Sequence, residues 1–257
     1  MKICVCIKQV PDVNAPIQIK NGQLIQDTDR MVLNAYDASA VEESLVLTEE
    51  HEGDIHILSV GPEKAKETIR KALAMGADEA THIQTADNAS YDSATYARIL
   101  AAWLKDQEFD VIACGKQSQD TDSGLAGGML AQHLDLPYST NAVGLSWEDD
   151  KLVVTRQGDS GQEVLELPTP CVVTCSNDMN EPRIPNLKGI MQSKRKPVEA
   201  IGLDDLGLPD DGLQPQTHIE SYHEKPGREP GKKLDDGEAD ELAAQLAKLL
   251  DEEAGVI

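Results

Sequence analysis

Short apolar runs and longer amphipathic stretches alternate through most of the chain. The runs are rich in Val, Ile and Leu, as buried strands are, and the stretches repeat apolar residues three and four positions apart, as helices do. The predicted strands are residues 3–10, 54–60, 80–84, 110–114 and 171–175. The predicted helices are residues 32–50, 63–75, 90–107 and a segment that starts after Ser123. Strands separated by helices predict an α/β fold, here a doubly wound, mostly parallel sheet with helices on both faces.

The pattern changes after Gly144. Residues 152–156 and 163–167 alternate around a Gly158-Asp159-Ser160-Gly161 turn, which predicts a β-hairpin insertion. Residues 203–235 are rich in Pro, Gly and Asp and have no periodicity, which indicates a C-terminal arm. The arm ends in an amphipathic helix, residues 237–253, with a stripe of leucines. Periodicity leaves open whether this helix docks on its own domain or on another chain.

The segment from Val111 to Leu134, VIACGKQSQDTDSGLAGGMLAQHL, is the most informative part of the sequence. A predicted strand ends at Cys114, a polar loop follows, and Asp122 or Ser123 can cap the next helix. Backbone N–H groups at a helix N-terminus lack partners, and the helix dipole favours negative charge, so the loop predicts an anion site. Neither the dinucleotide G-x-G-x-x-G motif nor the Walker motif is present, so the segment indicates phosphate without naming a nucleotide. An ordinary strand-to-helix turn is the alternative.

Other residues favour a phosphate site at the same edge of the sheet. Parallel sheets bind ligands beyond the carboxyl ends of their strands, and the predicted strands at Val10, Val60 and Cys114 all lead there. Lys116 can neutralise a phosphate as a point charge, although a solvated loop lysine is equally compatible with the sequence. Glycines on the loop and the first helical turns would let a phosphate approach the backbone: Gly124, Gly127 and Gly128.

Composition narrows the classes of partner and compartment. The chain of 257 residues has 46 acidic and 23 basic residues, and its net charge of −23 repels nucleic acid and anionic membranes. Acidic residues occur along the whole chain, which favours a halophilic protein over a merely acidic one. The five cysteines form no CxxC pair and are expected to be small buried hydrophobes in a reducing compartment. Without a signal peptide or an apolar run of about 18 residues, we expect a cytoplasmic protein with no membrane insertion.

Patterns for catalysis and metal binding are weak. The six histidines are scattered and neither HExxH nor GxSxG occurs, so we expect no catalytic residue and no metal site. His218 and His223 lie in the arm and are more typical of a surface pair than of metal ligands. Asp120 and Asp122 form a carboxylate pair, but helix capping and hydrogen bonds to ribose hydroxyls need no proton transfer.

The segment 176–196, SNDMNEPRIPNLKGIMQSKRK, is the second unusual feature. It contains prolines and apolar residues that we expect to be exposed, and its end is basic. The apolar residues are Met179, Ile184 and Leu187, and the basic ones are Lys188, Lys194, Arg195 and Lys196. Apolar residues on a rigid loop beside a basic patch of an acidic protein are typical of a protein-recognition element. A long connection without function is the alternative.

Five segments in order carry a family resemblance: VCIKQVPD (5–12), LNAYDASAVEES (33–44), ETIRKALAMGAD (67–78), GKQSQDTDSGLAG (115–127) and NEPRIPNLKGIMQSKRK (180–196). With them the chain resembles the β subunit of electron transfer flavoprotein, the group that includes the FixA proteins. The likeness runs over almost the whole length. Several motifs in the right order are far more specific than any one of them.

The resemblance implies a heterodimer with an α subunit that holds a redox-active FAD. The β subunit covers that flavin, binds an adenine nucleotide (AMP in most members), and is an electron carrier subunit without catalytic residues of its own. It takes electrons from acyl-CoA and other flavin dehydrogenases, as in fatty acid oxidation, and passes them to a quinone oxidoreductase of the FixC type. Residues 1–202 would be the nucleotide-binding α/β domain, with recognition loop 176–196. Residues 203–257 would be the arm and helix that dock on the α subunit.

The resemblance also implies site residues. The nucleotide contacts fall at Cys6, Asn34, Ala35, Tyr36, Asp37, Val60, Gly115, Lys116, Gln117, Ser118, Gln119, Asp120, Thr121, Asp122, Ser123, Gly124, Leu125 and Ala126. The partner-recognition residues are Met179, Asn180, Glu181, Pro182 and Arg183, with Met179 as the apolar anchor for partner dehydrogenases.

The loop departs from the family pattern in one place. After Asp122 the family commonly has polar residues that hold the phosphate, whereas this chain has Ser123-Gly124-Leu125-Ala126, which leaves mainly backbone N–H groups. A subgroup binds a second FAD in place of AMP and bifurcates electrons, with a D-G-D-T pattern that this loop matches only in part. AMP is therefore the expected ligand and a second FAD the alternative.

Two alternative functions that need no flavin-containing partner are also compatible with the sequence. A stand-alone adenine-nucleotide-binding regulatory protein, similar to universal stress proteins, has this general architecture, although such modules are usually shorter. An adenylating enzyme of the ATP-pyrophosphatase type would need an SGGxDS loop after the first strand, where this chain has Val10-Pro11-Asp12.

Overall fold

Nine of the described strands form one mixed sheet, in the order β11-β10-β9-β12-β8-β1-β6-β7-β13. The computed structural model describes residues 1–25, 30–87, 89–228 and 230–256. The strands are β1 (Lys2–Ile7), β6 (Asp54–Gly61), β7 (Glu79–Gln84), β8 (Val111–Gly115), β9 (Tyr138–Glu148), β10 (Lys151–Gly158), β11 (Gly161–Pro168), β12 (Cys171–Cys175) and β13 (Val198–Gly202). Neighbours from β9 to β13 in this order are parallel, and β10 and β11 add an antiparallel edge. The predicted α/β class and mostly parallel sheet are confirmed.

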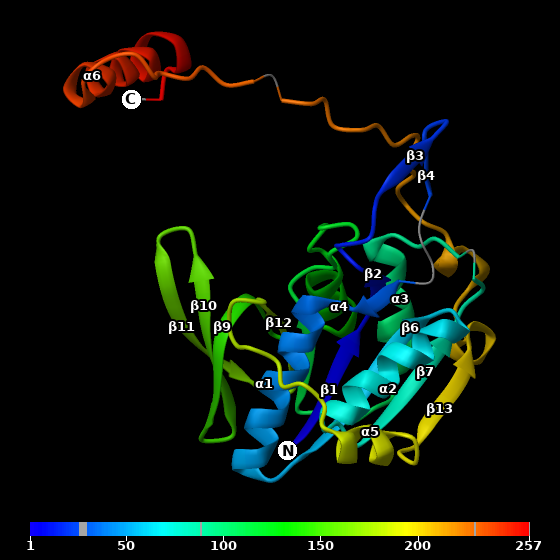
Figure 1. Cartoon of the computed structure of the whole chain (residues 1–257). Coiled ribbons are helices and arrows are strands. Elements are labelled where there is room, and N and C mark those ends of the chain that lie inside the picture. The colour runs from blue at the N-terminus through cyan, green and yellow to red at the C-terminus, as the bar shows by residue number, and fades with distance from the viewer. Residues whose placement is uncertain (26–29, 88, 229, 257) are drawn as a thin grey trace. The chain divides into compact units, whose positions relative to one another are not determined.

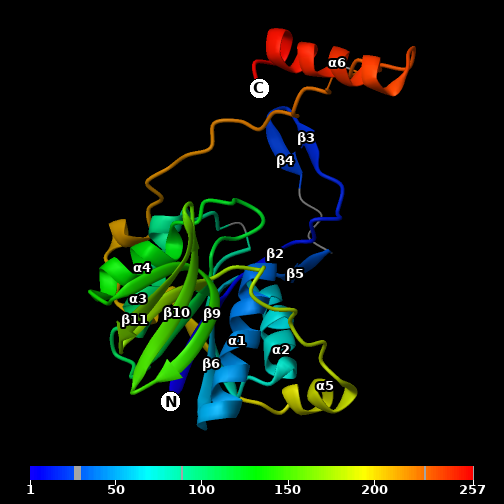
Figure 2. The same ribbon diagram turned by 90° about the vertical axis from the view of Figure 1, so that its left-hand side faces the viewer.

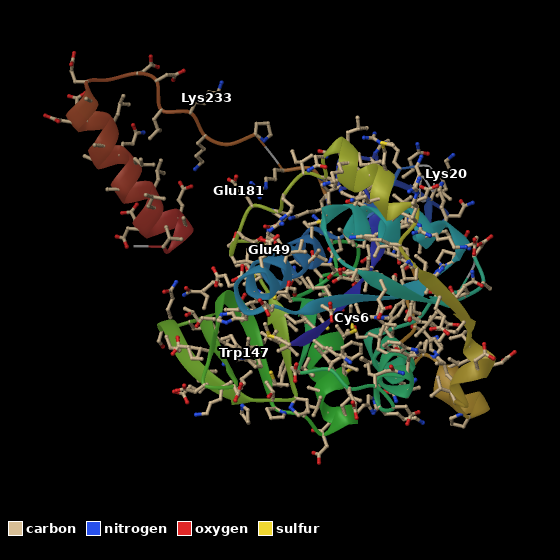
Figure 3. The ribbon with its side chains drawn as sticks, turned by 90° about the horizontal axis from the view of Figure 1, so that it is seen from below. Cys6, Lys20, Glu49, Trp147, Glu181 and Lys233 are labelled. Carbon is tan, nitrogen blue, oxygen red and sulfur yellow. The ribbon has the colours of Figure 1, made fainter. Side chains whose placement is uncertain are left out.

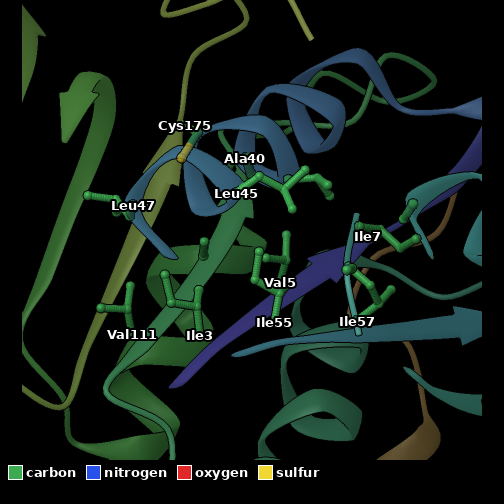
Figure 4. Close-up of a cluster of buried hydrophobic side chains, with 14 of the residues drawn as sticks. Ile3, Val5, Ile7, Ala40, Leu45, Leu47, Ile55, Ile57, Val111 and Cys175 are labelled. Carbon is green, nitrogen blue, oxygen red and sulfur yellow. The ribbon is translucent and has the colours of Figure 1, made fainter. Parts of the chain in front are cut away.

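Helices cover both faces of the sheet, as expected for a doubly wound fold (Figures 1 and 2). Buried residues of α1 (Ala35–His51) and α2 (Lys66–Met75) join one core cluster, and those of α3 (Ser93–Leu104) and α4 (Ala126–Leu134) join another. Strand β1 feeds both clusters, because successive side chains of a strand point to opposite faces. Ile3, Val5 and Ile7 pack on the α1 side (Figure 4), whereas Cys4 and Cys6 pack on the α3 side. All five cysteines are buried free thiols, which confirms their predicted role as small core residues.

The first predicted strand and the first predicted helix are both shorter than expected. Strand β1 ends at Ile7, and the short β2 (Gln9–Pro11) leaves the main sheet to pair antiparallel with β5 (Met31–Leu33). Residues predicted as the start of the helix are therefore strand, and α1 begins at Ala35. Helix α3 is capped by Asp92, whose carboxylate accepts a hydrogen bond from the backbone N–H of Thr95 at 2.9 Å.

Several elements were not predicted. They are β9, β13, the helix α5 (Leu187–Ser193) and a small hairpin of β3 (Gln18–Lys20) and β4 (Gln23–Ile25). The predicted hairpin insertion is confirmed as β10 and β11, which pair antiparallel through Gly158 and Gly161.

The described chain forms two compact units, residues 1–221 and 222–257. Residues 203–221, expected as the start of the arm, belong to the first unit, because Leu206 is buried in the α3-side cluster and Leu203, Leu208 and Leu213 pack on that cluster. The second unit contains α6 (Ala239–Leu249), followed by a π-helical turn, Leu250–Ala254. The predicted final helix is thus confirmed, and none of its residues is buried. Of the predicted arm and helix, Glu229 and Ile257 lie outside the described residues.

Candidate functional site at the switch point of the sheet

The strand order reverses direction beside β1. The chain passes from β1 to β6 and β7 on one side, and then continues with β8 and β12 on the other. The connections that leave the carboxyl ends of β1 and β8 therefore run in different directions. Open α/β sheets bind ligands at such a switch point. Cys6 of β1 and Cys114 of β8 lie opposite each other in register. Cys6, labelled in Figure 3, is buried at this end of β1.

Asp37 fastens the two diverging strand ends together. Its Oδ2 accepts a hydrogen bond from the backbone N–H of Lys8 at 2.7 Å, and its Oδ1 accepts one from the backbone N–H of Gly115 at 3.0 Å. A Cβ at position 115 would stand 2.2 Å from Asp37 Oδ1 and 2.7 Å from Tyr36 Cβ, so only glycine fits. Burial raises the pKa of Asp37 to about 7, against the opposing effect of the hydrogen bonds from Lys8, Asn34 and Gly115.

Asn34 ties the loop after β8 to the N-terminus of α1. Its Nδ2 donates to the carbonyl of Gln117 at 2.8 Å, and its Oδ1 accepts from the backbone N–H of Gln119 at 3.1 Å. The backbone N–H of Ala35 donates to Gln119 Oε1 at 3.2 Å. Asn34 stands at the N-cap position but makes no side-chain cap, because its amide binds the loop instead. Two segments implied by the resemblance, 34–37 and 115–126, are thus in direct contact.

The rest of the loop is held by its own side chains. Gln117 Nε2 donates to Tyr36 Oη at 3.2 Å and to Asp122 Oδ1 at 2.9 Å. The hydroxyls of Ser118 and Thr121 share a hydrogen bond of 2.9 Å. The loop reverses at Asp122 and Gly124, whose φ values of +50° and +62° lie in the left-handed region.

The helix after the loop starts later than predicted. Neither Asp122 nor Ser123 caps it, because α4 begins at Ala126 and its N-cap, Leu125, makes no side-chain cap. Ser123 instead shares a hydroxyl hydrogen bond of 2.8 Å with Ser93. Among the described residues, neither the N-cap nor the two predicted caps bind the N–H groups of the first turn of α4.

The glycines of α4 have a packing role that the sequence did not indicate. A Cβ on Gly127 would lie 2.3 Å from Thr174 Cγ2, so this glycine lets α4 approach β12. A Cβ on Gly128 would lie 3.3 Å from the Tyr138 ring. Close helix–sheet packing is thus a second role for these two glycines, beside the predicted approach of a phosphate.

Two further expected contacts sit at the edge of this cluster. Val60 is buried near the end of β6, and the β1–β6 register ends at Ile7 and Ser59, just before it. Lys116 is half-buried and forms no ion pair within the described part of the chain. Val60 and Cys6 can therefore meet a ligand only through backbone or a small exposed edge, whereas Lys116 keeps an uncompensated positive charge.

Lys8 is the site residue that sequence reasoning missed. Its Nζ lies 2.7 Å from Asp120 Oδ2 and 3.4 Å from Ser118 Oγ, and 5.4 Å from the centroid of the Tyr96 ring. Burial raises the pKa of Tyr96 to about 12, with a smaller contribution from Asp120. The polar Lys8–Gln9 pair inside the predicted strand 3–10 was the available signal that the strand ends there.

Segment 176–196 is fastened to α1 by polar side chains. Arg183 donates to both oxygens of Glu42, with Nε 2.9 Å from Oε2 and Nη2 3.0 Å from Oε1, and it also binds Glu49. The Glu49 and Glu42 carboxylates hold the pKa of Arg183 above its usual value. Asn180 Nδ2 donates to Glu43 Oε2 at 2.9 Å. Figure 3 labels Glu49 on α1 and Glu181 on the segment.

The apolar residues of this segment differ in exposure from what was expected. Met179 is only partly exposed, because it packs against the core cluster on the α1 side. Ile184 is 91% exposed and Leu187 is 74% exposed, as expected. Met191, on α5, is 63% exposed. The exposed apolar surface thus lies after Arg183, not at Met179.

Of the four basic residues near the end of the segment, Lys196 is engaged in hydrogen bonds to the backbone. Lys196 Nζ donates to the carbonyls of Leu73, Gly76 and Ala77 and so caps the C-terminus of α2. Burial lowers the pKa of Lys196. Lys188, Lys194 and Arg195 remain exposed, so the expected basic patch is smaller by one residue.

Comparison with known proteins decides the family. A family model described as "Electron transfer flavoprotein domain" matches residues 22–206. The electron transfer flavoprotein subunit beta of Bacillus subtilis is 36% identical over 258 residues, which cover 100% of both chains. The human protein of the same description is 34% identical over 254 residues, 97% of this chain and 98% of the relative. The chain belongs to the electron transfer flavoprotein β-subunit family. As a β subunit of that family it has an α subunit as its partner.

A relative of another kind belongs to the same family. Subunit CarD of the caffeyl-CoA reductase–Etf complex of Acetobacterium woodii is 34% identical over 258 residues, 98% of each chain. Its identity is close to that of the human electron transfer flavoprotein subunit, so identity alone does not say which of these two relatives the chain resembles more.

No described helix is long and apolar enough to cross a membrane. Among the described residues, no group of three or more His, Cys, Asp or Glu side chains is arranged to hold a metal ion.

Proposed function

We propose that the chain carries electrons, as the β subunit of a heterodimeric electron transfer flavoprotein, from acyl-CoA and other flavin dehydrogenases to a quinone oxidoreductase of the FixC type. In this proposal it binds AMP as a structural ligand and covers the FAD of the α subunit. The observation that carries the nucleotide part is the loop of residues 115–125, which Asn34 and Asp37 hold at the switch point of the sheet.

The residues of the switch point suit a phosphate. The first turn of α4 has no side-chain cap, and backbone N–H groups at a helix N-terminus attract anions. Lys116 carries a charge without an ion-pair partner among the described residues. The side chains that the family commonly uses after Asp122 are missing, so backbone N–H groups and Lys116 would hold the phosphate. AMP would join the loop to α1 and supply no redox chemistry.

A second FAD in place of AMP is the alternative. It is supported by the similarity to CarD, a subunit of a reductase–Etf complex, over 98% of this chain. Flavin content separates the two proposals, because the AMP form has one FAD per heterodimer and the alternative has two.

Segment 176–196 is proposed as the recognition loop for dehydrogenases. Its exposed apolar residues, Ile184 and Leu187, lie beside exposed Lys188, Lys194 and Arg195, so the surface suits an acidic partner with an apolar pocket. Arg183 and Asn180 fix the loop on α1 instead of reaching outward. Met179 packs inward, and we therefore propose Leu187 as the anchor in its place.

The experiment is to produce the chain with its α subunit and to purify the complex. The proposal expects a yellow heterodimer whose flavin is reduced by an acyl-CoA dehydrogenase and its substrate, and then reoxidised by a quinone oxidoreductase. A chain that purifies alone and without flavin, from cells that also make the α subunit, would contradict it.

A further inference from the structure

We propose that Lys8 is a positioning residue of the nucleotide site, which acts by holding Asp120 and thereby the loop of residues 117–122. The inference rests on the proposed binding of AMP at this site. Lys8 is not among the residues that the family resemblance implies for nucleotide contact, yet it joins the segments that are.

The backbone of Lys8 connects β1 to α1. Its N–H donates to Asp37 Oδ2 at 2.7 Å, and its carbonyl accepts from the N–H of Asn34 at 3.1 Å. Asp37 and Asn34 are the same residues that hold Gly115, Gln117 and Gln119. Both the N–H and the carbonyl of Lys8 are therefore hydrogen-bonded, which fixes the position of its Cα and the origin of its side chain.

The side chain of Lys8 connects that point to the loop and to α3. The ammonium donates to Asp120 Oδ2 at 2.7 Å and lies 3.4 Å from Ser118 Oγ. It also lies over the ring of Tyr96, 5.4 Å from the centroid, on α3. Tyr96 in turn contacts Tyr91 edge-on, with ring centroids 5.7 Å apart. The ammonium thus has partners on two elements besides its own.

The ion pair is sheltered from solvent. The side chain of Lys8 is 26% exposed and that of Asp120 is 18% exposed, although Asp120 lies on a surface loop. A sheltered, charge-assisted hydrogen bond at 2.7 Å is stronger than an exposed surface pair. Asp120 is consequently engaged by Lys8, and Lys116 is left as the loop cation that can face a phosphate.

The test measures AMP affinity in the full heterodimer after removal of the endogenous nucleotide, by calorimetric titration with AMP. Lys8→Met keeps most of the length of the side chain and removes its charge, and Asp120→Asn removes the charge of the partner. Each is expected to weaken AMP binding at least about tenfold, the loss that corresponds to one hydrogen bond to a charged group. The double variant is expected to bind no more weakly than Lys8→Met alone, because both changes remove the same interaction.

Three variants or readouts separate positioning from other causes. Lys8→Arg keeps the charge and is expected to restore most of the affinity. Lys2→Met, a matched change at the exposed start of β1, the strand that precedes Lys8, is expected to leave AMP affinity unchanged. The melting temperature of the FAD-containing complex is expected to stay within a few degrees of the parent, so that weaker binding is not general unfolding. Should Lys8→Met fail to assemble, Asp120→Asn on the exposed loop carries the test.

Unchanged AMP affinity in Lys8→Met or in Asp120→Asn would overturn the inference. So would a double variant that loses the sum of the two single effects, since Lys8 would then contact AMP independently of Asp120. A parent heterodimer that binds no AMP would instead contradict the proposed nucleotide function, and the two failures are therefore distinguishable.

Discussion

Asp37 shows how one side chain builds the site. Both of its carboxylate oxygens accept backbone N–H groups, one at the end of β1 and one at the end of β8. The resemblance implies Asp37 as a nucleotide contact, but periodicity could not reveal its buried hydrogen bonds, because they join residues 29 and 78 positions apart. The site residues on continuous segments were thus predictable, whereas the bonds that assemble them were not.

Asp37→Asn is expected to destabilise the protein by about 2 kcal/mol or more. Asparagine offers one acceptor oxygen and one NH2 group, so a buried N–H of Lys8 or Gly115 would face a donor. Urea denaturation of parent and variant measures the difference. Asp54→Asn, at an exposed position, is the control and should change stability little. Equal stability of Asp37→Asn and the parent would contradict the role of Asp37 in joining the ends of β1 and β8 by hydrogen bonds.

Asp92 accepts hydrogen bonds from the backbone N–H groups of Gln216 and Thr217, and we expect these bonds to be sensitive to acid. Burial raises its pKa, but hydrogen bonds from Thr95, Gln216 and Thr217 outweigh burial and bring the pKa down to about 2. Since the folded pKa lies below the unfolded value of 3.8, the attachment contributes stability above about pH 4 and loses it as the pH falls towards 2.

Amide exchange at Gln216 and Thr217, whose N–H groups donate to Asp92, is therefore expected to accelerate as the pH is lowered from 5 to about 2.5, beyond the intrinsic pH dependence of exchange. In Asp92→Asn the protection should already be reduced at pH 7 and should change less with pH. Protection that is the same in both proteins over this range would refute the assignment.

At the scale of elements, the predictions succeeded where the sequence has a clear periodic pattern of apolar residues. The long helices, the buried parallel strands and the β10–β11 hairpin were predicted because each has a clear apolar repeat. α5 and β13 were missed because they are short and lie in a proline-containing stretch. The start of α1 was misjudged because Met31–Leu33 continue its apolar pattern, although they pair with β2.

The recognition loop gives a prediction that separates packing from partner contact. Leu187→Ala should weaken dehydrogenase binding by roughly thirtyfold, the effect of about 2 kcal/mol at a buried interface anchor. It should leave flavin content and stability unchanged, because Leu187 is 74% exposed. The apparent KM for the electron transfer flavoprotein in a dehydrogenase-coupled assay measures the effect.

Met179→Ala is the matched comparison. Because Met179 packs on the core, its truncation should lower stability by about 1–2 kcal/mol and change KM little. The reverse result, a raised KM for Met179→Ala with none for Leu187→Ala, would restore Met179 as the anchor.

At the scale of the whole molecule, the C-terminal unit contains an amphipathic helix with a leucine stripe. Helix α6 and the turn that follows it carry a stripe of leucines, Leu242, Leu246, Leu249 and Leu250, and neither element contains a buried residue. An isolated amphipathic helix of this length is marginal in water, so its stability must come from a packed apolar face. We propose the α subunit as the surface that receives it.

Replacing Leu242 and Leu246 by serine is expected to weaken heterodimer formation at least about tenfold, since burial of each leucine contributes about 1.5–3 kcal/mol. Deleting residues 236–257 should have at least the same effect. Ala244→Ser with Lys248→Ser, on the opposite side of the helix, is the control. Analytical ultracentrifugation over a dilution series measures assembly, and unchanged dissociation of the leucine variant would rule out this docking.

The central claim is that the switch-point loop holds AMP in a flavoprotein heterodimer. Denaturing the purified heterodimer and quantifying the released nucleotides by chromatography tests it most directly. The account predicts one AMP and one FAD per heterodimer. Two FAD and no AMP, or one FAD with no second adenine nucleotide, would contradict it.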